Sequence, residues 1–139
     1  MNLKEITQTL KAKQYKLTPQ RIAIIKIMLE VNHPLSALDV FQKVKVYHSN
    51  ISLDTVYRSL HLLAAIGVVS LINIANRERE LFELAQHHHH LVCTKCGQVI
   101  CMESILMEHD TIMQQAATTE NFQVTGHAFE VYGFCSNCH

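Results

Sequence analysis

Two Cys-x-x-Cys motifs are the strongest chemical signal in this chain of 139 residues. The first pair is Cys93 and Cys96, and the second is Cys135 and Cys138. Each motif places two thiolates on one tight turn, where they can occupy two corners of a tetrahedron. Together they predict a structural Zn(II) site with no open position for catalysis. Disulfides or a redox pair are weaker alternatives, because a start without a secretory signal indicates a reducing compartment.

A run of four histidines, residues 87–90, stands just before the first of these motifs. If the run lies in a strand, successive side chains point to opposite faces. His88 and His90 then share one face, and His87 and His89 share the other. The run therefore predicts two His-x-His metal sites and not one cage of four rings. Each pair needs further ligands, and the candidates are Glu83, Cys101, Glu103, Glu108, His109, Asp110 and His127.

Charge divides the chain into two parts. Residues 1–80 carry 11 Lys and Arg against 6 Asp and Glu, whereas residues 81–139 carry Lys95 alone against 6 acidic residues. A basic front half suggests a nucleic-acid partner, although chance and solvated faces explain such an imbalance as readily. The rear half holds all five Cys and seven of the ten His, so the metal chemistry is expected there.

Four helices are predicted to position these groups in the front half. Apolar residues at helical spacing indicate the first helix over residues 3–13. Thr18 and Pro19 begin a second, more buried helix, Ser36 begins a third, and Ser52 begins the fourth. The predicted apolar face of the fourth helix consists of Leu53, Val56, Leu60 and Leu63.

The pattern changes from helix to strand after Gly67, which stands where a helix-ending glycine belongs. Residues 68–74 and 80–84 are typical of two short strands joined by a polar turn. Helices followed by such a hairpin predict a winged helix, with the fourth helix in the recognition position. An ordinary amphipathic helix with a solvated face is the alternative, and His48 and His61 are interpreted as surface polar residues. The exposed face of the fourth helix would offer Ser52, Asp54, Thr55, Tyr57, Arg58 and His61 for phosphate and base contacts.

The rear half is predicted to mix strands with one helix. A strand is expected over residues 87–92 and another over residues 98–102, on either side of the first cysteine turn. Ser104 can cap a helix that runs to about residue 118. Residues 122–134 alternate as a strand or hairpin, and this excursion must return the second cysteine pair to the first.

The sequence resembles the ferric uptake regulator family of bacterial metal-dependent repressors over nearly its whole length. The matching segments are LTPQR (17–21), LSALDVF (35–41), LDTVYRSL (53–60), FEL (82–84), HHHHLVCTKCG (87–97), TGH (125–127), VYGFC (131–135) and the closing Cys138. The resemblance implies an α+β fold, with an N-terminal winged-helix DNA-binding domain over residues 1–84 and a C-terminal α/β dimerisation domain over residues 85–139. It also implies a cytoplasmic homodimer that represses transcription from A/T-rich, inverted-repeat operator DNA and has no membrane segment.

The same resemblance assigns residues to DNA and to metals. Tyr57 and Arg58 carry over as contacts from the recognition helix, and Lys16 and Arg21 as backbone contacts. The four cysteines carry over as the structural zinc ligands. The sensory site maps to Glu83, His88 and His90, with His33 and Cys101 as further candidate ligands. The second regulatory site maps to His87, His89, Asp110 and His127, and Glu108 competes with Asp110.

The regulatory ion is expected to be Fe(II) or Zn(II), with Mn(II) as a further option. A thiolate from Cys101 would favour zinc or undergo oxidation, and the alternative is a buried core cysteine. Glu83 stands where the zinc-sensing branch usually has a cysteine, and Ser70 stands where that branch has an aspartate. These residues leave iron and zinc both open.

Four functions compete at this point. Metal binding to a closed form that favours DNA would make the chain a metal-responsive repressor. A peroxide sensor that oxidises its own ligands through Fe(II) is the alternative within the family. A zinc-dependent enzyme is more distant, because neither HExxH nor the zinc deaminase signature is present, and we expect no catalytic residues. Metal storage would leave the recognition helix unexplained.

Overall fold

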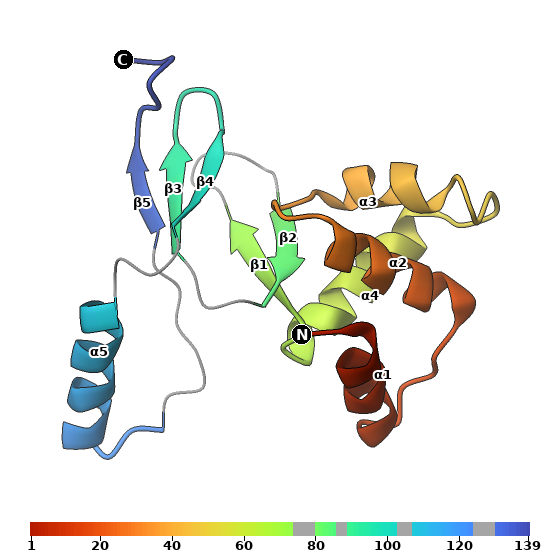
Figure 1. Cartoon of the computed structure of the whole chain (residues 1–139), viewed down its shortest axis with the longest axis horizontal. Coiled ribbons are helices and arrows are strands. Elements are labelled where there is room, and N and C mark those ends of the chain that lie inside the picture. The colour runs from red at the N-terminus through yellow and green to blue at the C-terminus, as the bar shows by residue number, and fades with distance from the viewer. Residues whose placement is uncertain (74–79, 86–88, 103–106, 124–129) are drawn as a thin grey trace. The chain divides into compact units, whose positions relative to one another are not determined.

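The computed structural model divides into two compact units, Met1–Gln86 and His87–His139 (Figure 1). The residues described are 1–73, 80–85, 89–102, 107–123 and 130–139. The predicted features outside these ranges are the polar turn at 76–79, His87, His88, Glu103, Ser104 and His127. The side chains of His89, Glu108, His109 and Asp110 are also outside the description, although their backbone is included. No described helix is long and apolar enough to cross a membrane.

The first unit has the predicted order of four helices followed by two strands. Its elements are α1 (Leu3–Ala12), α2 (Pro19–Glu30), α3 (Ala37–Val44), α4 (Leu53–Ala65), β1 (Val69–Asn73) and β2 (Glu80–Leu84). The predicted N-cap side chains of Thr18, Ser36 and Ser52 each accept a hydrogen bond from the backbone N–H three residues later. Gly67 follows α4 with a φ of 80°, a value that glycine adopts without strain. These local signals are confirmed because they act within one helical turn.

The wing is attached to the helices through one short bridge. β1 and β2 pair antiparallel, and Leu35, just before α3, adds two hydrogen bonds to Phe82 of β2, with N–O distances of 2.8 and 2.7 Å. Phe82 is completely buried among the helices. The predicted winged helix is confirmed, and β2 is fixed against the helical core.

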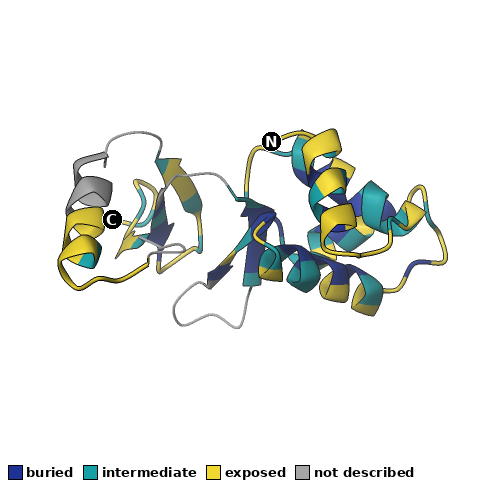
Figure 2. Cartoon of the chain, turned by 90° about the horizontal axis from the view of Figure 1, so that it is seen from below, coloured by how far each residue is buried: buried dark blue, intermediate teal, exposed yellow. Residues whose placement is uncertain are grey.

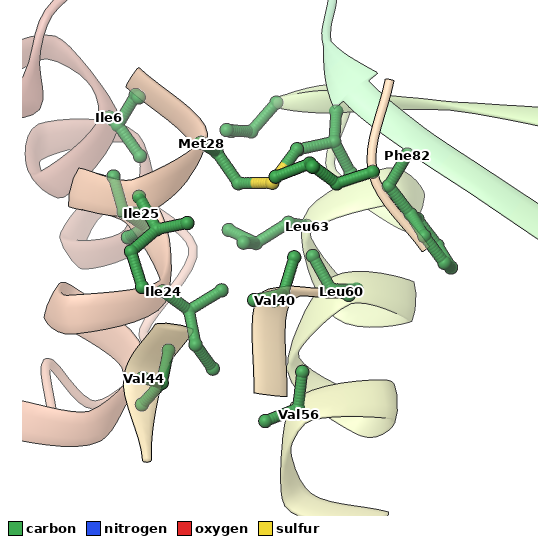
Figure 3. Close-up of a cluster of buried hydrophobic side chains, with 14 of the residues drawn as sticks. Ile6, Ile24, Ile25, Met28, Val40, Val44, Val56, Leu60, Leu63 and Phe82 are labelled. Carbon is green, nitrogen blue, oxygen red and sulfur yellow. The ribbon is translucent and has the colours of Figure 1, made fainter. Parts of the chain in front are cut away.

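All four helices contribute to one apolar core. Figure 3 shows side chains such as Ile6 of α1, Ile24 of α2, Val40 of α3 and Leu60 of α4 in this cluster. Figure 2 shows the same helices buried on their inner faces and exposed on the outer ones. The predicted face of α4 is wrong at Leu53, which is 43% exposed. Leu53 is the first residue of the helix and lies beyond the edge of the apolar core.

The second unit contains a mixed three-stranded sheet and one helix. Its elements are β3 (His89–Cys93), β4 (Val99–Met102), α5 (Met107–Thr119) and β5 (Glu130–Gly133), and the strand order is β4-β3-β5. β4 pairs antiparallel with β3, whereas β5 pairs parallel with it. Because parallel strands end at the same edge of a sheet, the chain leaves β3 and β5 side by side. The two cysteine turns follow at that edge.

Replacing Leu60 with alanine tests the core of the first unit. The side chain is fully buried, so Leu60→Ala is expected to lower the free energy of unfolding by about 2–5 kcal/mol. Leu53→Ala is the matched control on the same helix, and we expect it to change stability by no more than about 0.5 kcal/mol. Chemical denaturation followed by helical circular dichroism measures both. Similar losses in the two variants would contradict the assignment of the buried face.

Candidate metal centre and DNA-contact residues

The four predicted cysteines meet at one end of the second unit. Their Sγ atoms all lie within 4.8 Å of one another, and those of Cys96 and Cys135 are 3.7 Å apart. None of the four forms a disulfide. Tetrahedral zinc with Zn–S bonds of about 2.3 Å separates its sulfurs by about 3.8 Å. The arrangement therefore fits a four-thiolate zinc site.

Backbone hydrogen bonds shape the two turns around these sulfurs. The Cys93 Sγ accepts from the backbone N–H groups of Cys96 and Cys135, at 3.5 and 3.3 Å. Gly97 closes the first turn by donating to the Cys93 carbonyl at 2.9 Å, with a φ of 81°. The Thr94 N–H donates to the Gly133 carbonyl at 2.9 Å and so ties the first turn to the end of β5. Each pair is therefore positioned by the sheet as well as by its own spacing.

Two of the four thiols, Cys93 and Cys138, differ strongly in pKa. The backbone N–H groups of Cys96 and Cys135 lower the pKa of Cys93 to about 5. In contrast, hydrogen bonding to the Cys135 sulfur, together with burial, raises the pKa of Cys138 to about 12. Four adjacent thiolates repel one another, and a divalent cation offsets that repulsion. The donor set suits zinc on charge as well as on geometry.

His90 and Cys101 lie opposite each other in the sheet. They are register partners on β3 and β4, and their ligand atoms lie within 4.8 Å. His90 is buried, but Cys101 is exposed. This exposure contradicts the interpretation of Cys101 as a core cysteine, and β4 lies at one edge of the sheet among the described strands. Its thiolate can serve as a soft ligand beside an imidazole.

Glu130 carries a carboxylate next to His90 in the sheet register, a position that sequence reasoning missed. It begins β5 and is the register partner of His90 on the side opposite Cys101. Its carboxylate accepts a hydrogen bond from the Tyr132 hydroxyl. No local pattern marks this residue, since its proximity to His90 comes only from parallel pairing of distant segments.

Two further sensory candidates belong to the first unit. Glu83 is buried on β2, and its cross-strand partner is Ser70 on β1. The Nδ1 atom of exposed His33 lies 3.1 Å from the Pro34 carbonyl oxygen. If Nδ1 carries the proton and donates this bond, the Nε2 lone pair remains available to a metal, as in many histidine ligands.

The remaining regulatory residues are not placed by the structure. His87, His88 and His127 lie outside the described residues, and the side chains of His89 and Asp110 do too. The second metal site therefore stays a prediction, and so does the choice between Glu108 and Asp110.

The recognition helix α4 presents two of the predicted DNA contacts to solvent. The Arg58 side chain is 79% exposed and forms a 2.9 Å ion pair with Asp54, one turn earlier. Tyr57 is also exposed. The hydroxyls of Ser52 and Thr55 are 2.9 Å apart in the N-cap, where they serve the helix end. Tyr57 and Arg58 are thus the longer reaching side chains of this face.

The segment before α2 carries the other two predicted contacts. The Arg21 guanidinium donates to the Lys16 backbone carbonyl, and this bond orders the chain before the helix. The Lys16 side chain is exposed, whereas Arg21 is half-buried. A cation on an ordered loop beside a helix start is a common phosphate contact.

A family comparison decides the identity of this arrangement. Residues 12–132 match the model of the "Ferric uptake regulator family". The chain belongs to the ferric uptake regulator family. It is accordingly a metal-dependent transcriptional repressor, and its winged helix and four-cysteine cluster agree with the fold of that family.

Individual relatives span nearly the whole chain. The ferric uptake regulation protein of Bacillus subtilis is 36% identical over 138 residues, which are 96% of this chain and 91% of that protein. The peroxide operon regulator of the same organism is 30% identical over 98% of this chain and 92% of its own length. The structure of the ferric uptake regulator from Pseudomonas aeruginosa with manganese matches with a TM-score of 0.80 and 25% identity, and the match covers 94% of this chain and 97% of that one. A ferric uptake regulation protein and a peroxide operon regulator are therefore both similar to this chain.

Loss of one zinc ligand is expected to remove the metal and unfold the second unit. Cys135→Ser leaves three thiolates, so a chain purified with zinc should lose its tightly bound ion and much of its strand signal. Zinc content by mass spectrometry and circular dichroism measure the two effects. Cys101→Ser is the matched control, because it removes a thiol of the same sheet outside the cluster, and it should keep the ion. Full zinc content in Cys135→Ser would rule out the four-cysteine assignment.

Proposed function

We propose that this chain is a metal-responsive repressor that binds inverted-repeat operator DNA as a homodimer when its regulatory site holds Fe(II) or Zn(II). The family match over residues 12–132 carries this proposal. We further propose that residues 1–84 bind DNA and residues 85–139 dimerise and bind metals. The cytoplasm is the proposed location, because a repressor acts where bacterial operators are.

The proposed DNA surface is the exposed side of α4 with the segment before α2. Tyr57 and Arg58 would contact bases and phosphates from the major groove, which admits an α-helix. Lys16 and Arg21 would fix the register through the phosphate backbone. The exposure of Tyr57 and Arg58 supports this assignment.

Exposed apolar side chains on the second unit support a homodimer. Tyr132 and Val131 lie on β5 and are 46% and 40% exposed. Phe134, just after β5, is 62% exposed, and Ile100 on β4 is 43% exposed. β5 is also an edge strand among the described strands, so one side of its backbone is open to pairing. A second copy would cover these groups with the same patch of its own surface.

The proposed sensory site takes ligands from both units. Its expected ligands are His33, Glu83, His88, His90 and Cys101. The opposed placement of His90 and Cys101 and the carbonyl-bonded Nδ1 of His33 support three of them. An ion that binds only when both units contribute ligands shifts the population toward a DNA-competent form. The second site would use His87, His89, His127 and either Asp110 or Glu108.

The nature of the ion follows from the ligand types. One thiolate among histidines and a carboxylate favours Zn(II) more than an all-carboxylate set would, although Fe(II) and Mn(II) also accept nitrogen and oxygen ligands. Peroxide sensing is the second candidate, because peroxide-responsive repressors are among the similar proteins. Under that alternative, Fe(II) bound to the histidines would direct oxidation at its own ligands.

Operator binding should depend on the regulatory ion. We expect the purified dimer to bind a duplex selected from a random pool roughly 5- to 150-fold more tightly with the effective metal than after mild chelation, the range typical of allosteric coupling. Fluorescence anisotropy with Fe(II), Zn(II) and Mn(II) added separately identifies that metal. Peroxide treatment of the Fe(II) form, compared with the Mn(II) form, separates the two candidate functions. Equal affinity with and without metal would refute the switch.

Replacing Cys101 is expected to change the metal preference. Cys101→Glu exchanges a soft ligand for a hard one, so Zn(II) affinity should fall more than Mn(II) affinity. Competition titrations with a chromophoric chelator measure both constants. Gln98→Glu adds the same carboxylate three residues earlier and should change neither the Zn(II) affinity nor the Mn(II) affinity. Equal losses for the two ions would show that the Cys101 thiolate is not a ligand.

A further inference from the structure

A side-chain hydrogen bond joins the recognition helix to the wing within the first unit. The Nε2 atom of His61 on α4 lies 3.0 Å from an Oε atom of Glu80 on β2. The His61 ring lies 4.3 Å from the Tyr57 ring, measured between centroids, with a tilt of 46°. Its opposite contact is the fully buried Phe82, edge-on at 5.4 Å. His61 therefore lies between the exposed Tyr57 and the core, and it is a surface polar residue, as predicted, with defined partners on both sides.

Glu80 also acts on Tyr57. Burial raises the pKa of the Tyr57 hydroxyl, and hydrogen bonding and the negative charge of Glu80 raise it further. The Tyr57 ring thus contacts His61, and Glu80 lies near enough to the Tyr57 hydroxyl to raise its pKa.

Secondary structure makes this arrangement rigid. Tyr57 and His61 are four residues apart and share one face of α4. Glu80 and Phe82 are two residues apart and share one face of β2. Phe82 is buried and bonded through its backbone to Leu35, so β2 cannot shift without disturbing the core. The wing therefore offers a fixed point from which Glu80 reaches the helix.

We propose that His61 and Glu80 are positioning residues for DNA recognition, which hold the Tyr57 side chain in its operator-binding orientation and couple it to the wing. This inference rests on the proposed function, since it requires Tyr57 to contact the operator. The His61 and Glu80 side chains are each 36% exposed, and polar contacts so open to solvent contribute little to stability, even when both groups are charged. Their effect is therefore on the orientation of the Tyr57 ring.

The sign of the effect separates positioning from simple electrostatics. Glu80 carries a negative charge near a surface that binds polyanionic DNA, so removing the charge alone should tighten binding. If Glu80 positions Tyr57, Glu80→Gln should instead weaken binding about three- to tenfold, the range expected for loss of one orienting contact. His61→Ala should weaken binding similarly, and His61→Gln should recover part of the loss because an amide can still donate to Glu80.

The experiment uses the full-length dimer with its structural zinc and the metal that gives the tightest binding. Affinity for the selected duplex is measured by anisotropy at one fixed salt concentration for wild type, Glu80→Gln, His61→Ala and His61→Gln. Glu30→Gln is the matched control, because it makes the same substitution at an exposed position of α2 that lies outside the proposed DNA surface. It should bind as tightly as wild type or more tightly. Thermal unfolding of each variant shows whether the folded fraction at the assay temperature is unchanged.

Coupling to Tyr57 is the decisive readout. In a Tyr57→Ala background, Glu80→Gln should cause no further loss, because the group that it positions is absent. Repeating the duplex selection with Glu80→Gln should also relax base preference at the positions that Tyr57→Ala relaxes. A purely structural role of Glu80 would change neither pattern.

The outcomes distinguish this inference from the function on which it rests. Two results would overturn only the positioning role, provided that Tyr57→Ala weakens binding. In the first, Glu80→Gln binds DNA as tightly as wild type. In the second, the loss of affinity in Glu80→Gln adds fully to the loss in Tyr57→Ala. The positioning role is also overturned if the loss of DNA affinity in Glu80→Gln is explained by the unfolded fraction of that variant. If Tyr57→Ala leaves affinity unchanged, the proposed recognition surface itself is wrong. Failure of the wild type to select any duplex with any of the three metals would overturn the proposed function.

Discussion

The parallel pairing of β5 with β3 is the constraint on which the second unit depends. It brings the chain after residue 133 alongside the turn after Cys93, and four sulfurs meet there. Among the described residues of this unit only His90, Val92 and Cys93 are buried, so the described part of the unit has a small apolar core. A metal ion that joins both turns replaces the stability that such a core would otherwise supply. The zinc ligands and the sheet are therefore parts of a single folding unit.

The first unit is stabilised in a different way. Its four helices bury apolar side chains against one another and against Phe82 of the wing, with no metal ligand in the cluster as described. This difference suits a metal switch, because the first unit can stay folded whether or not a regulatory ion is bound. It also explains the value of a wing that is anchored in the core. Contacts from β2 to α4 can then orient side chains of the recognition helix without moving the helix itself.

Sequence reasoning worked best where the physical rule is local. N-caps at Thr18, Ser36 and Ser52 and the glycine after α4 act over a few residues, so they could be predicted. The apolar period of α4 was correct for its interior but wrong at Leu53, because periodicity does not show where a core ends. For Cys101, the sequence left two interpretations open, a metal ligand and a core cysteine. Only the order of the described strands shows that β4 lies at an edge of the sheet.

The sequence by itself determined the ligand chemistry of this protein, because thiolate and imidazole side chains at close spacing can serve few purposes other than metal binding. It also determined the winged helix, since three of the helices carry their own N-caps and the two strands differ from the helices in composition and period. Tertiary structure alone decided which distant residues meet. Glu130 lies beside His90 in the register of two parallel strands, and Glu80 of the wing bonds to His61 of α4. Such contacts arise from packing of segments far apart in the chain, and no local pattern in the sequence records them.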